Sequence, residues 1–130
     1  MRLIREFMAA LQLLLEGKDL EHRREELKKL YEQYIGPYEL YHNATIDVAM
    51  RALASYDEGQ RLERMEMLAE LYYAEADTVT GPDRNFLLDK AFNLFALIER
   101  NGKTFSMDRR YKMALIEQRL KKCSGKTRCE

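Results

Sequence analysis

Apolar side chains recur at steps of three and four residues along most of this chain, and few helix-breaking residues interrupt them. Only two prolines and six glycines occur among the 130 residues. Steps of three and four place side chains on one face of an α-helix, whereas a strand requires alternation of two. The pattern therefore predicts an all-α protein whose helices are joined by short turns.

The interruptions divide the chain into about six helices. We expect them over about residues 2–16, 20–35, 44–56, 58–78 and 82–100, and a sixth from Ser106 that fades toward the carboxyl terminus. Gly17 is expected to end the first helix as a left-handed cap. In the sixth helix, Met107, Tyr111, Ala114, Leu115 and Leu120 are expected to face inward. Short connections force neighbouring helices to run antiparallel, so we expect stacked hairpins or a small bundle.

A chain of this length can bury one core and is too short for two domains of ordinary size. We expect a single helical domain over residues 1–121 and a basic, flexible tail over residues 122–130. Cys123 and Cys129 both lie in the last eight residues, outside any apolar pattern. Neither is expected to cross-link the core, and this usage fits a reducing cytoplasm.

The amino-terminal segment does not fit an export signal. Glu6 interrupts the front of its apolar run, and no cleavage site of small residues follows. No apolar stretch approaches the roughly eighteen residues that a membrane span requires. We therefore expect a cytoplasmic protein with no membrane partner.

Two segments carry a resemblance to a known helical architecture. "LAELYYAEA" followed by "FLLDKAFNLFALIE" resembles the two helices of a tetratricopeptide hairpin, with small Ala69 and Ala91 where the helices approach closely. Over roughly residues 2–121 the layout is also similar to a family of uncharacterised bacterial proteins with tetratricopeptide-like helices. That family has no established catalytic residues, so the resemblance implies a fold and supplies no reaction.

The stretch "GPYELYHN" places Glu39 three residues before His42, a spacing that di-iron proteins use to supply two ligands from one helical face. Such a site needs about six ligands, and His22 is the only other histidine. His22 lies in a stretch dense in charges of both signs, which is typical of a solvated helix face. The competing interpretation is that His42 packs its ring against Tyr38 or Tyr41. No metal or other cofactor is expected, and a metal-binding bundle enzyme is kept only as an alternative.

Catalytic and phosphate-binding patterns are not evident. Neither histidine is placed beside a serine or cysteine nucleophile by its sequence position. The single-glycine turns lack the spacing of a phosphate-binding loop. The many tyrosines are expected in the core or at a subunit contact, because tyrosine suits positions with one dry and one wet end. A ligand groove lined by them is the alternative.

Charge is segregated along the chain although its total is balanced. Residues 57–79 hold seven acidic and two basic side chains, whereas residues 100–130 hold ten basic and three acidic ones. The simpler interpretation is that the acidic and basic helices face each other, within one molecule or across a dimer. The alternative is that the last helix binds an acidic partner or a nucleic-acid backbone. The charges around that helix do not favour nucleic acid, because no recognition-helix pattern accompanies them.

These observations lead to the hypothesis of a non-enzymatic helical module that binds a protein partner or a second copy of itself. A homodimer is expected because the apolar face of the first helix is wider than one neighbour can cover. The expected contact residues are tyrosines and basic side chains of the faces described above: Tyr34, Tyr38, Tyr41, Tyr73, Arg109, Arg110 and Lys112.

Overall fold

Seven α-helices make up the regular structure of the described residues, which are 3–17, 19–102 and 105–124 of the computed structural model. They are α1 (Leu3–Leu15), α2 (Leu20–Tyr34), α3 (Tyr38–Asn43), α4 (Ile46–Leu53), α5 (Glu58–Ala76), α6 (Gly81–Asn101) and α7 (Met107–Ser124). No strand occurs in these ranges. The prediction of an all-α fold is confirmed.

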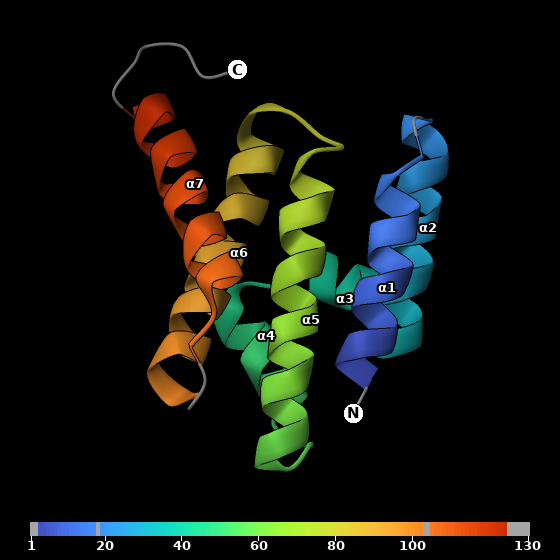
Figure 1. Ribbon diagram of the computed structural model, residues 1–130, viewed down its shortest axis with the longest axis vertical. Coiled ribbons are helices and arrows are strands. Elements are labelled where there is room, and N and C mark those ends of the chain that lie inside the picture. Colours follow the sequence, from blue (N-terminus) through green and yellow to red (C-terminus); the bar gives the residue numbers. More distant parts are fainter. Residues whose placement is uncertain (1–2, 18, 103–104, 125–130) are drawn as a thin grey trace.

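The long helices stand side by side with α5 at the centre, and those that follow one another in the chain, α1 and α2 and then α5, α6 and α7, run antiparallel (Figure 1). The α1–α2 hairpin packs on one side of α5, and α6 followed by α7 packs on the other. The short helices α3 and α4 lie behind α5 in this view and carry the chain from α2 back to the start of α5. Sequential helices therefore form stacked hairpins, as the short connections predicted.

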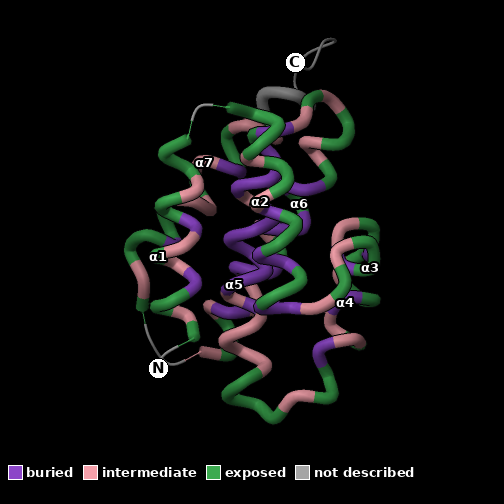
Figure 2. Tube along the Cα trace, turned by 90° about the vertical axis from the view of Figure 1, so that its right-hand side faces the viewer, coloured by how far each residue is buried: buried purple, intermediate pink, exposed green. Residues whose placement is uncertain are grey.

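The core is concentrated on α5 and α6, where most of the buried trace lies (Figure 2). The buried positions of α5 surround its axis from Met65 onward, because neighbours cover it on several sides. A helix that is buried all round is typical of the centre of a fold. Ala69 of α5 and Ala91 of α6 are both fully buried, consistent with a close approach of these two helices.

Side-chain caps fix several helix starts at predicted positions. Asp19 accepts a hydrogen bond from the backbone N–H of Glu21 at the start of α2. Ser106 likewise accepts from the N–H of Arg109 at the start of α7. These bonds satisfy backbone donors that the first turn of a helix leaves without partners. Gly17, by contrast, does not have the left-handed conformation expected of it, and that prediction is wrong.

The structure corrects the sequence-based boundaries in two places. The joint between the second and third predicted helices is itself a helix, α3. Its sequence "YELYHN" forms only about one and a half turns, which is too short to show a helical period. At the other end, α7 continues to Ser124, so the helix runs into the predicted tail. The expected flexibility of the tail beyond that point concerns residues 125–130, which lie outside the described residues.

The predicted inward face of the last helix is wrong in part. In α7 the expected inward residues Met107 and Tyr111 are 75% and 64% exposed, whereas Arg109 and Ile116 are buried. The reason is that both α5 and α6 present carboxylates to α7, among them Glu70 and Glu99, so cationic side chains of α7 turn toward them.

Candidate functional site

The joint segment between α2 and α4 is held against the core by its tyrosines. Tyr41 is 4% exposed, and its ring lies against the backbone of Gly36. A Cβ atom at Gly36 would lie 2.8 Å from the Cε2 atom of that ring, so the close approach requires glycine. Glu32 of α2 accepts a hydrogen bond from the backbone N–H of Tyr38 and thereby caps α3. The joint is therefore a fixed element of the fold.

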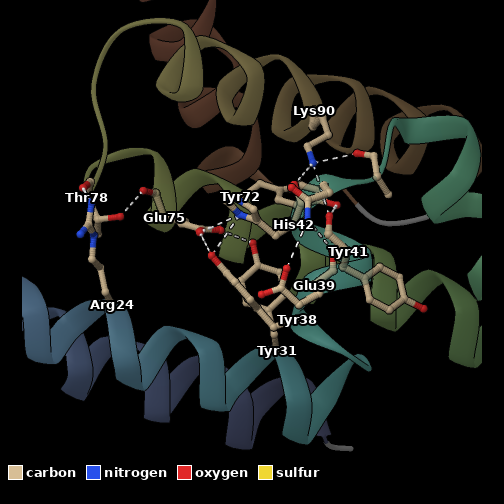
Figure 3. Close-up of polar contacts among 12 residues, drawn as sticks. Arg24, Tyr31, Tyr38, Glu39, Tyr41, His42, Tyr72, Glu75, Thr78 and Lys90 are labelled. Carbon is tan, nitrogen blue, oxygen red and sulfur yellow. Dashed lines mark hydrogen bonds and ion pairs between the residues drawn. The ribbon is translucent and has the colours of Figure 1, made fainter.

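A buried carboxylate, Glu75 of α5, collects three hydrogen-bonding groups from this joint and from α2 (Figure 3). The Tyr31 hydroxyl donates to Oε1 at 2.6 Å, and the Tyr38 hydroxyl donates to Oε2 at 2.5 Å. The Nδ1 atom of His42 lies 2.8 Å from Oε2. Glu75 thus ties α2, α3 and α5 together. We call Tyr31, Tyr38, His42 and Glu75 the carboxylate cluster.

The tyrosines of this region act as hydrogen-bond donors and not as bases near neutral pH. Burial raises the pKa of the Tyr31 hydroxyl well above 10, and the Glu75 carboxylate raises it further. Burial and the same carboxylate also raise the pKa values of Tyr38 and Tyr72. The phenols stay protonated because an ionised phenol would lie in a poorly solvated site beside an acceptor.

Lys90 of α6 is the second buried charged group of the joint, and its side chain is 2% exposed. Its ammonium group donates to the backbone carbonyls of His42 and Ala44, both at 2.8 Å, and to that of Tyr41 at 3.4 Å. It also lies 4.2 Å from the ring centroid of Tyr72. Burial lowers the pKa of Lys90 to about 8, against the opposing effect of Glu75. A cation at these carbonyls suits the negative end of α3 and joins it to α6.

A surface pocket of about 200 Å³ opens beside the carboxylate cluster. It is lined by Arg24, Lys28, Tyr38, His42, Glu75 and the turn at Thr78 and Val79. The Arg24 guanidinium donates to the backbone carbonyl of Thr78 at 3.0 Å, which fixes one rim (Figure 3). The pocket therefore combines side chains from α2 and α3 with the end of α5.

The predicted tyrosine contacts mostly point into the fold. Tyr34 is 6% exposed; its hydroxyl donates to Glu6 of α1 at 2.6 Å, and burial followed by this bond raises its pKa to about 12. Tyr41 is buried as described above, and Tyr38 and Tyr73 are partly buried. The proposed role of these tyrosines in partner binding stays a prediction, while their burial gives Tyr34 and Tyr41 a packing role in the chain itself.

The predicted basic contacts mainly pair with carboxylates of α5 and α6. Arg109 is 4% exposed, and its Nε atom lies 2.8 Å from a carboxylate oxygen of Glu99. Lys112 lies 2.7 Å from Glu70, and Arg119 lies 3.4 Å from Asp77. The interpretation that the acidic and basic helices face each other is confirmed within the molecule. Arg110 differs from these residues because its side chain is 61% exposed.

Replacing Lys112 with methionine tests how far the ion pairs hold α7 in place. The Glu70 carboxylate would lose its ammonium partner while still largely buried, and burial already raises the pKa of Glu70. We expect a loss of about 1 to 2 kcal/mol in the free energy of unfolding, measured by urea denaturation. Lys121→Met, on an exposed position of the same helix, is the control and should cost less than about 0.5 kcal/mol. Equal effects of the two changes would contradict a holding role for the pair.

The candidate metal ligands do not come together. Glu39 and His22 are both exposed, on α3 and α2 respectively, and His42 points its Nδ1 atom at Glu75. No group of three or more His, Cys, Asp or Glu side chains suited to a metal occurs in the described ranges. The ring of His42 stacks on that of Tyr38, with centroids 4.9 Å apart. The interpretation of His42 as a packing residue of the joint is confirmed for Tyr38.

Sequence reasoning missed Glu75, Lys90, Arg24 and Lys28. The signal for two of them was present: Lys90 lies among Leu87, Ala91 and Leu94 in the buried stripe of α6, and Glu75 follows Tyr72 in that of α5. A charged residue inside an apolar stripe is seldom buried without a partner. Arg24 and Lys28 carry no comparable signal, because they lie on the charged face of α2.

No helix within the described ranges is both long and apolar enough to cross a membrane. Comparison with family models, curated proteins and solved structures finds no match to this chain. These comparisons therefore supply no relative that supports the resemblance to tetratricopeptide-like proteins.

Proposed function

We propose that this chain is a non-enzymatic helical module for protein–protein interaction, and that it forms a homodimer through the outer face of α7. The observation that carries the proposal is the orientation of this helix. Its buried face holds Arg109 and Ile116, while apolar Met107 and Tyr111 face solvent. An exposed apolar face beside charged groups is typical of an interaction surface.

The spacing of this outer face fits a helical partner. Met107, Tyr111, Ala114 and Gln118 are all exposed and follow one another at steps of four, three and four residues. Such steps form a straight seam along one side of a helix. Ala114 leaves room for a second helix to approach, and Phe105 adds a further side chain that is 66% exposed.

A second copy of this chain is the partner we propose first. Two identical seams can meet around a two-fold axis, so that Tyr111 of one copy packs near Ala114 of the other. Arg110 lies beside the seam with its guanidinium 5.4 Å from the Phe105 ring centroid. Among the predicted basic contact residues, Arg110 is the one that we propose binds the partner. The first helix, from which a homodimer was predicted, also has exposed apolar residues, among them Leu13 at 72%.

The proposal also includes the cellular location of the protein and its family. We propose a cytoplasmic protein, because both cysteines lie in the last eight residues of the sequence and outside its apolar stripes. We also propose kinship with the uncharacterised tetratricopeptide-like bacterial family. Support comes from the α5–α6 hairpin and from the buried pair of small residues, Ala69 and Ala91.

Light scattering after size-exclusion chromatography tests the proposed dimer. We expect the mass of the wild-type chain to rise toward twice its monomer value between roughly 10 and 300 micromolar, a range that suits a weak dimer. The double change Met107→Lys and Tyr111→Lys should keep the chain monomeric without altering its helical circular dichroism.

The control is Val48→Lys, which introduces one lysine at an apolar position of α4 that is 38% exposed. This variant should dimerise like the wild type. A wild-type mass that stays monomeric at the highest concentration would rule out self-association. Equal loss in the α7 and α4 variants would place the contact elsewhere than on the outer face of α7.

A further inference from the structure

The pocket beside the carboxylate cluster is large enough to hold a small molecule. Its volume of about 200 Å³ exceeds several times the roughly 30 Å³ that one water occupies in the liquid. Its wall is formed by the fixed joint, where Tyr38 and His42 are both held to Glu75. A ligand would therefore meet side chains whose positions are already set, which reduces the entropy lost on binding.

Two cations at the rim lack the carboxylate partners that the cations of α7 have. Arg109, Lys112 and Arg119 each lie within 4.0 Å of a carboxylate oxygen. Arg24 and Lys28 lie in no ion pair with any residue of the described ranges. The guanidinium of Arg24 uses one nitrogen for the Thr78 carbonyl, and the ammonium of Lys28 lies 5.4 Å from the Tyr38 ring centroid. Among the described residues, no carboxylate therefore forms an ion pair with either cation at this opening.

The one carboxylate in the pocket wall is already occupied. Both oxygens of Glu75 accept hydrogen bonds, Oε1 from Tyr31 and Oε2 from Tyr38, and His42 lies against Oε2 as well. The two rim cations outnumber Glu75 in formal charge, so the pocket favours an anion.

The orientation of His42 adds a polar atom to the site. The contact of Nδ1 with Glu75 and the stacking on Tyr38 fix the plane of the ring. The side chain is 30% exposed, and Nε2 makes no hydrogen bond to any residue of the described ranges. A histidine held by a carboxylate through one nitrogen presents the other to a ligand in a defined direction.

We propose that this pocket binds a small molecule through an oxyanion group, a phosphate or a carboxylate, with Arg24 and Lys28 as its cationic contacts. His42 lines the same wall, and its Nε2 atom is the group that we propose orients the ligand. An arginine and a lysine together suit such a group, because the guanidinium can form paired hydrogen bonds and the ammonium supplies a compact charge. This site is separate from the outer face of α7 and does not depend on dimer formation.

Nuclear magnetic resonance titration tests the site with inorganic phosphate and with acetate as separate probes. Sodium chloride at matched ionic strength corrects for general screening. We expect saturable shifts confined to the backbone amides of Arg24, Tyr38, His42 and Thr78. Saturation by phosphate identifies a phosphate site, and saturation by acetate alone identifies a carboxylate site; either result supports the proposal.

A matched pair of lysines on α2 makes the test specific. Lys28→Gln removes a rim cation and should weaken the apparent affinity at least about fivefold, as expected for the loss of one charge-assisted contact. Lys29→Gln changes the neighbouring lysine, which is 72% exposed and pairs with Glu26, and should change affinity less than twofold, roughly the size of a general charge effect. The absence of saturation with both probes would overturn the proposal. Equal weakening in the two variants would overturn it as well, because it would indicate screening by surface charge.

Discussion

Replacing Lys90 with methionine is expected to lower the free energy of unfolding by about 2 to 3 kcal/mol. Methionine is an unbranched side chain one atom shorter than lysine, and it cannot donate to the carbonyls of Tyr41, His42 and Ala44. The Tyr41 carbonyl keeps a donor from the Tyr72 hydroxyl, so two carbonyls lose their partner. Each orphaned buried acceptor costs about 1 to 3 kcal/mol, partly offset because the ammonium no longer has to be desolvated. Urea denaturation followed by circular dichroism measures the difference.

The pH dependence of the same variant separates lost hydrogen bonds from a general packing defect. The pKa of Lys90 is about 8 in the folded chain and 10.5 in the reference state. Between these values the unfolded chain binds more protons, so the stability of the wild type should rise with pH by up to about 1.4 kcal/mol per unit. Above about pH 9 the trend reverses, because several buried tyrosines have raised pKa values, among them Tyr38 and Tyr72, and the unfolded chain releases these protons first.

Lys90→Met should lack the rise between pH 8 and pH 9. Lys29→Met, at a position exposed to solvent, is the control; it should cost less than about 0.5 kcal/mol and keep the rise. A wild-type stability that is flat or falling over this interval would contradict the assignment of Lys90 as a buried group whose pKa is lowered by burial.

The fold was predictable because its main determinants are local. The period of apolar residues and the capping residues Asp19 and Ser106 act within one helix, and they locate most of the long helices. The helix α3 was missed because its six residues are too few to display a period. The inward face of α7 was mistaken because Arg109 is buried by carboxylates of other helices, which the sequence of α7 does not contain.

The candidate site depends on contacts that join distant parts of the chain. Tyr31 and Glu75 are 44 residues apart, and Lys90 and His42 are 48 residues apart. A pattern within one helix indicates which residues share a face but not which face of another helix they meet. "GPYELYHN" shows this limit: its histidine was correctly expected to pack on Tyr38, whereas its link to Glu75 required the tertiary structure.

Glu75→Leu is expected to lower the free energy of unfolding by about 3 kcal/mol, because it removes the acceptor on α5 to which groups of α2 and α3 bind. The volume changes little, so the cost arises from the groups left without a partner. The Tyr31 hydroxyl would be orphaned in the core, where the residue is fully buried. Tyr38 and His42 can still contact each other, since the hydroxyl and Nδ1 lie 3.1 Å apart. Glu25→Leu on the exposed face of α2 is the control and should cost less than about 0.5 kcal/mol.

A second substitution distinguishes the orphaned hydroxyl from a packing defect. Tyr31→Phe removes that hydroxyl, so in the Glu75→Leu background it should recover about 1 kcal/mol or more. In the wild type the same change should instead destabilise the fold by about 1 kcal/mol, because it takes a donor from Glu75. The sign of the Tyr31→Phe effect should therefore reverse between the two backgrounds. Simple addition of the two losses would mean that the Tyr31–Glu75 bond does not stabilise the joint.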